Sequence, residues 1–104
     1  MRSFAIPIML ISASAAPVLA GEVVKVNIAD LAYLPADLTV HVGDTIEWVN
    51  GDFVDHTATA SGAEWDIAVL AKKTARFELK RAGTFDYICR YHPNMTGKIR
   101  VLER

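Results

Sequence analysis

The segment Cys89-Arg90-Tyr91-His92-Pro93-Asn94-Met95, near the C-terminal end, places a thiol, an imidazole and a thioether close together in the chain. Its pattern is C-x2-H-x2-M, and Cys89 is the only cysteine among the 104 residues. A thiolate, imidazoles and a weakly bound thioether form the ligand set that suits copper. Such a site takes two histidines. The segment therefore predicts a copper site that needs one more histidine from elsewhere in the fold.

The local geometry of this segment favours a shared site over three unrelated side chains. Cys89, His92 and Met95 follow one another at intervals of three, which an extended strand could not aim at one point. Pro93 predicts a turn, because proline fixes φ and cannot continue a strand ladder. The alternative is an inert cysteine, packed in the core on the same strand face as Phe85 and Tyr87.

Two other histidines compete to complete the site, His41 and His56. His41 alternates with Val40 and Val42, which predicts that it lies on the solvent side of its strand. His56 follows the turn signal Asn50-Gly51-Asp52 and begins a short β-branched run, so it can sit where a loop enters a strand. We expect His56 to be the second histidine ligand.

Other metal and catalytic chemistries fit this set of residues less well. Zinc favours additional thiolates or a carboxylate, and methionine is a poor zinc ligand. A Cys–His nucleophile would need a third orienting group and an oxyanion site, for which the sequence holds no motif. The chain has only three histidines, too few for a multicopper cluster. We expect a binding site for one copper ion per chain and no enzymatic activity.

Alternation of apolar and polar residues predicts a series of short strands without a long helix. The strands are expected at residues 22–28, 38–42, 45–49, 56–60, 74–79, 84–89 and 97–102. Residues 30–37 contain Pro35 and are expected to be an irregular connection, and residues 61–73 fit either a helical turn or a long loop. About seven short strands predict an all-β antiparallel sandwich.

The first 20 residues have the pattern of a secretory signal peptide. Arg2 precedes an apolar run, and Val18-Leu19-Ala20 is an acceptable cleavage signal before Gly21. Residues 1–20 are thus expected to be removed, without stable membrane insertion, leaving a domain at 21–104. That domain has a net charge of −2, which does not favour nucleic-acid binding. A single cysteine in an exported protein is a free thiol, an intermolecular bridge or a ligand.

Three segments together resemble the cupredoxins, the type 1 blue copper proteins. They are residues 38–50, residues 56–60 and residues 83–97. The short C-x2-H-x2-M loop is most similar to that of the amicyanin-like members. This resemblance implies a Greek-key sandwich, with His56, Cys89 and His92 as strong copper ligands and Met95 as the weak axial ligand.

The resemblance also implies a function. It is that of a monomeric periplasmic carrier whose copper cycles between Cu(I) and Cu(II), passing one electron at a time between larger redox proteins. An amine dehydrogenase and a c-type cytochrome are the partners it points to. The alternative is a periplasmic copper-binding or copper-delivery protein that uses the same ligands without fast electron exchange.

Two positions depart from the pattern of these relatives. Thr57 stands where the family often has asparagine, and its hydroxyl is expected to fix the copper loops in a similar way. Tyr91 stands where amicyanins have proline. Its backbone N–H is expected to donate to the Cys89 sulfur and thereby raise the reduction potential.

Overall fold

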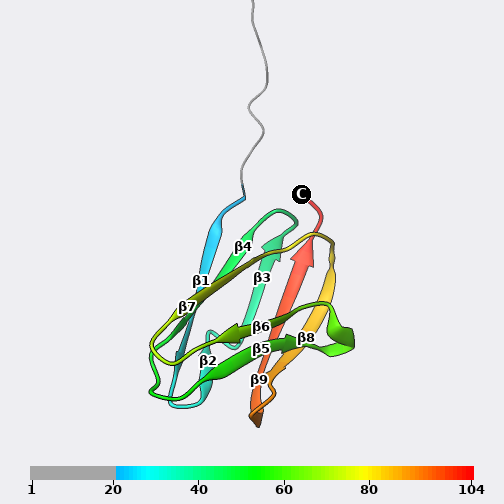
Figure 1. Cartoon of the computed structure of the whole chain (residues 1–104). Helices are drawn as coiled ribbons and strands as arrows, with labels where there is room; N and C mark the ends of the chain where they lie inside the picture. Colours follow the sequence, from blue (N-terminus) through cyan, green and yellow to red (C-terminus); the bar gives the residue numbers. More distant parts are fainter. Residues whose placement is uncertain (1–20) are drawn as a thin grey trace, which may run out of the picture.

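The computed structural model describes residues 21–104, so the predicted signal peptide lies outside the described residues. The described residues form two β-sheets packed face to face, with one short 3-10 turn, η1 (Ser61–Ala63). No helix within this part of the chain is long and apolar enough to cross a membrane. The predicted β-sandwich is confirmed (Figure 1).

The two sheets share nine strands among residues 21–104. The four-stranded sheet has the order β2 (Ala32–Leu34), β1 (Val23–Ala29), β4 (Thr45–Asn50) and β7 (Thr74–Glu78). The five-stranded sheet has the order β3 (Asp37–His41), β9 (His92–Leu102), β8 (Gly83–Cys89), β5 (His56–Ala60) and β6 (Asp66–Val69). Neighbours in these orders are often far apart in sequence, because the chain crosses repeatedly between the sheets.

The pairing and the strand count differ from the sequence-based expectation in two respects. Pairs β1·β4 and β3·β9 are parallel, so each sheet is mixed rather than purely antiparallel. Strands β2 and β6 lie in the segments expected to be irregular or helical, which raises the count from about seven to nine among the described residues. Both strands are short, at three and four residues, and give too few alternations to be recognised.

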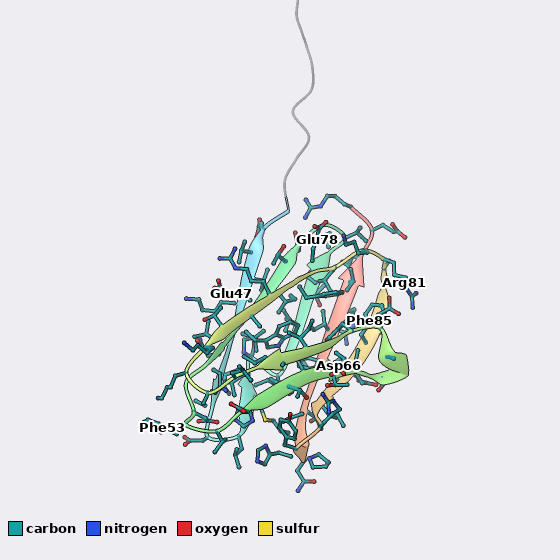
Figure 2. The ribbon with its side chains drawn as sticks, viewed as in Figure 1. Glu47, Phe53, Asp66, Glu78, Arg81 and Phe85 are labelled. Atoms are coloured by element: carbon teal, nitrogen blue, oxygen red, sulfur yellow. The ribbon has the colours of Figure 1, made fainter. Side chains whose placement is uncertain are left out.

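The core lies between the sheets, where the alternating apolar side chains of each strand meet (Figure 2). At its centre Tyr87 packs against Tyr33 and Trp48, with ring centroids 4.4 and 5.8 Å away. Trp48 Nε1 donates a hydrogen bond to the Tyr87 hydroxyl at 3.2 Å. Burial raises the pKa of Tyr87 to about 12, so this hydroxyl stays neutral. Gly97 lies so close to the Tyr87 ring that a side chain there would displace it.

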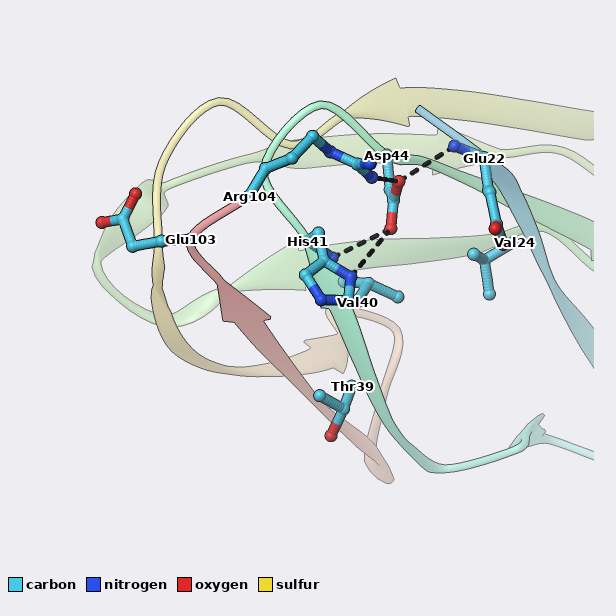
Figure 3. Close-up of a pocket in the computed structure, with 8 residues that line it drawn as sticks. All are labelled: Glu22, Val24, Thr39, Val40, His41, Asp44, Glu103 and Arg104. Carbon is cyan, nitrogen blue, oxygen red and sulfur yellow. Dashed lines mark hydrogen bonds and ion pairs between the residues drawn. The ribbon is translucent and has the colours of Figure 1, made fainter. Parts of the chain in front are cut away.

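A buried carboxylate fastens one end of the sandwich (Figure 3). Asp44, in the turn between β3 and β4, accepts hydrogen bonds from the backbone N–H groups of Glu22 and His41, each at 2.9 Å. The guanidinium of Arg104 also donates to it. Burial alone would raise the pKa of Asp44, but these donors outweigh burial and lower it. One side chain thus joins the start of β1, the β3–β4 turn and the C-terminal residue.

Candidate metal centre

The strand order brings three predicted ligands to one end of the five-stranded sheet. Strands β5 and β8 are antiparallel neighbours, so His56, the first residue of β5, lies beside Cys89, the last residue of β8. Strands β8 and β9 form a hairpin in which Cys89 pairs with His92, the first residue of β9. A register irregularity between Ile88 and Cys89 accompanies the tight turn at the hairpin end.

The donor atoms of these residues converge. Cys89 Sγ lies 3.7 Å from His56 Nδ1 and 3.6 Å from His92 Nδ1, and the donor atoms of all three residues lie within 4.8 Å of one another. One metal ion lies about 2.0–2.3 Å from an imidazole nitrogen or a thiolate sulfur, so it can bridge S···N distances of up to about 4.4 Å. His56 and Cys89 are fully buried and His92 is half-buried. The three residues can therefore hold a single metal ion.

Asp52, which the sequence marks only as part of a turn, contacts the buried histidine. Its Oδ2 lies 2.8 Å from His56 Nε2. An ionised carboxylate only accepts hydrogen bonds, so Nε2 carries the proton and the Nδ1 lone pair faces Cys89. Burial would raise the pKa of Asp52, but hydrogen bonds from the Leu31 N–H, His56 and the Asp30 N–H lower it. The carboxylate thus stays charged.

Thr57 connects the two loops that carry the donors. Its backbone N–H donates to Cys89 Sγ at 3.4 Å, and its hydroxyl accepts a hydrogen bond from the Arg90 N–H at 2.9 Å. The expected loop-fixing role of this hydroxyl is confirmed. The expected bond from Tyr91 is not found: among residues 21–104, the backbone N–H that reaches the sulfur is that of Thr57.

Met95 and His41 occupy contrasting positions. Met95 is 3% exposed, lies three residues into β9 from His92 and lines the same hollow as His92. His41 pairs in register with Leu102, at the other end of the same 11-residue strand, and its half-exposed ring faces Asp44. The expectation that His41 points away from the site is confirmed.

A hollow opens onto the half-buried histidine. It has a volume of about 340 Å³ and is lined by Leu31 and by residues 91–95. Leu31 is 48% exposed and Tyr91 57% exposed, which gives the rim apolar surface, and the exposed Asn94 adds a polar amide. His92 is therefore the member of the cluster nearest to solvent.

The sandwich and the His–Cys–His cluster at its end define a small all-β protein with a mononuclear metal site, and the donor set is that of copper. The chain belongs to the cupredoxin-like family, whose domain model matches residues 2–101. It is 37% identical over 94 residues to amicyanin of Paracoccus denitrificans, covering 85% of this chain and 71% of that protein.

Solved structures give the same result. The crystal structure of amicyanin from Paracoccus versutus has a TM-score of 0.66 and 32% identity, covering 83% of this chain and 84% of that one. A Cu(I) form of an amicyanin mutant has a TM-score of 0.68 and 32% identity, covering 81% and 85%. Copper is accordingly the metal of this site, and the chain is an electron carrier of the cupredoxin class.

Proposed function

We propose that the protein is a periplasmic one-electron carrier that binds one copper ion through His56, Cys89 and His92, with Met95 as a weak axial ligand. The observation that carries this proposal is the convergence of Cys89 Sγ with two Nδ1 atoms at 3.6 and 3.7 Å. When bound, copper supplies the one-electron redox couple. The residues of the chain supply binding, orientation and access.

The ligands are held by a frame that resists movement. Each of the three strong ligands sits at a strand end, and the hydrogen bonds of Thr57 and Asp52 connect their loops. Three strong ligands and one weak ligand suit both oxidation states of copper. Because such a site hardly moves when the oxidation state changes, it exchanges electrons with little reorganisation. Electrons enter and leave the site through His92, since it alone of the three strong ligands lines the surface hollow.

The proposal extends to partners and location. The apolar rim around His92 suits brief contacts with larger redox proteins, which bury little surface. An amine dehydrogenase as donor and a c-type cytochrome as acceptor are the specific partners we propose, by analogy with amicyanins. Residues 1–20 act as the export signal, and residues 21–104 act in the periplasm as a monomer.

The rival function is copper delivery, and the rate of electron self-exchange distinguishes the two. A carrier exchanges electrons rapidly between its Cu(I) and Cu(II) forms, because His92 brings the site to the surface and the ligands stay in place. We expect line broadening in NMR spectra of mixtures of the two forms to report fast exchange. Slow self-exchange combined with transfer of copper to a metal-free acceptor protein would contradict the proposal.

The charge distribution predicts how this exchange responds to salt. Several charged side chains lie in ion pairs: Glu64 with Arg81 at 2.7 Å, Asp66 with Arg90 at 3.2 Å and Glu47 with Arg76 at 2.7 Å. Residues 21–104 carry a net charge of only −2. Strong electrostatic steering changes association rates by about 10–1000-fold. We expect the self-exchange rate to change less than about threefold between low and physiological salt; a change of tenfold or more would contradict this expectation.

A further inference from the structure

The carboxylate of Asp52 is shared by a buried ligand and a surface turn. Asp52 lies in the loop between β4 and β5, and its carboxylate accepts three hydrogen bonds. One comes from His56 Nε2 at 2.8 Å. The other two come from the backbone N–H groups of Asp30 at 2.9 Å and Leu31 at 3.1 Å, in the turn between β1 and β2.

The β1–β2 turn has a backbone conformation that needs this support. Asp30 and Leu31 have φ values of 51° and 61°, in the left-handed region that a leucine seldom adopts. Such a conformation persists where the surroundings fix it. Successive N–H groups of this turn point at one acceptor, which is the arrangement that binds an anionic oxygen. Asp52 is that acceptor.

The loop that carries Asp52 is itself fixed from the core. The buried Asn50 side chain accepts a hydrogen bond from the Asp52 N–H at 2.8 Å. Its amide group donates to the carbonyl oxygens of Val54 at 3.0 Å and Val69 at 2.9 Å. The loop that carries the Asp52 carboxylate is therefore held in place by hydrogen bonds to a buried side chain.

The turn that Asp52 holds forms one wall of the hollow over His92. Leu31 lines this hollow together with residues 91–95 and exposes about half of its side chain. The same carboxylate thus fixes the inner histidine, His56, and a piece of the surface beside the outer histidine, His92.

We propose that Asp52 is a positioning residue for electron transfer, which locks the His56 imidazole with Nδ1 toward Cys89 and holds Leu31 at the rim of the hollow. This inference rests on the proposed function, because it concerns the same site. The negative charge on the far side of His56 also favours the more highly charged oxidation state of the ion, and so lowers the reduction potential.

Asp52→Asn tests this role, because asparagine keeps the shape and loses the charge and one acceptor oxygen. We expect a higher reduction potential and about 10–100-fold weaker Cu(II) binding in competition with a chelator. In the metal-free protein, we expect the amide protons of Asp30 and Leu31 to exchange faster with solvent. The matched control is Asp55→Asn: Asp55 lies in the same loop and accepts the Ala71 N–H at 2.8 Å, and among residues 21–104 its side chain makes no hydrogen bond to the His56 ring.

The outcomes separate this proposal from the proposed function. A copper-loaded wild-type protein without an intense blue band would contradict the function. A blue wild type would contradict the role of Asp52 if Asp52→Asn matched Asp55→Asn in potential, copper affinity and amide exchange. If Asp52→Asn does not fold, NMR of the reduced wild-type protein decides. A slowly exchanging His56 Nε2–H supports the proposal, and a freely exchanging one overturns it.

Discussion

We expect Cys89→Ser to abolish the intense visible absorption band of the copper-loaded protein. That band requires the thiolate-to-copper bond, and Cys89 supplies the only thiol of the chain. Loss of a partner that merely orients a ligand costs about 10–100-fold in metal affinity, so loss of this thiolate should cost more. Serine nearly matches cysteine in size and can still accept the Thr57 N–H, so the fold should persist. Visible absorption and EPR spectra measure the loss of the thiolate–copper bond, and circular dichroism shows whether the fold persists.

A histidine variant is the matched control for this experiment. His41 lies at the other end of β3 and β9 from the cluster, so His41→Gln should keep the full band and one copper per chain. A blue band that survived in Cys89→Ser would show that the ligand set is assigned wrongly. So would a colourless wild-type protein that preferred zinc.

The second large effect is expected from Asp44→Ala, which should reduce the free energy of unfolding by about 2–4 kcal/mol. The side chain of Asp44 is 5% exposed. Its removal leaves the Glu22 and His41 N–H groups without their acceptor and breaks the ion pair with Arg104, whose Nε still donates to the Val42 carbonyl oxygen. The two hydrogen bonds from backbone N–H groups to the ionised carboxylate account for most of this cost, because the ion pair with the 37% exposed Arg104 side chain contributes less. Denaturant titration of the metal-free protein measures the difference.

The pH dependence of this difference follows from the lowered pKa of Asp44. The folded protein binds the proton of this carboxyl more weakly than the unfolded chain does. Its stabilising contribution is therefore complete above the unfolded pKa of about 3.9, and is lost as pH falls through the lower folded pKa. The difference in the free energy of unfolding between the wild type and Asp44→Ala should therefore become smaller below about pH 4. Asp52 also has a lowered pKa, but it is present in both proteins, so its contribution to the pH dependence cancels in the difference.

Asp86→Ala is the control for Asp44. The side chain of Asp86 is 68% exposed and lies 3.9 Å from Lys98, so its loss should change the free energy of unfolding by no more than about 0.5 kcal/mol. Equal effects of the two substitutions would show that the Asp44 contacts contribute little.

Local sequence determined most of the strands and half of the site. Alternation of apolar and polar residues, which has the period of a strand, and the β-branched run at residues 56–60 together marked seven of the nine described strands, with β5 correct to the residue. The C-x2-H-x2-M spacing places Cys89 and His92 on either side of one turn, so these two donors could be predicted to lie together without a fold, and Met95 stays a prediction.

Tertiary structure alone decided which strands pair and how the distant residues of the site come together. Alternation states which face of a strand is buried but not which strand lies beside it, so the parallel pairs β1·β4 and β3·β9 were not predictable. The alternation around His41 favoured His56, but the strand order is what brings His56 to Cys89, 33 residues away. The role of Asp52 depends on a turn 21 and 22 residues earlier, whose N–H groups meet its carboxylate only in the folded chain.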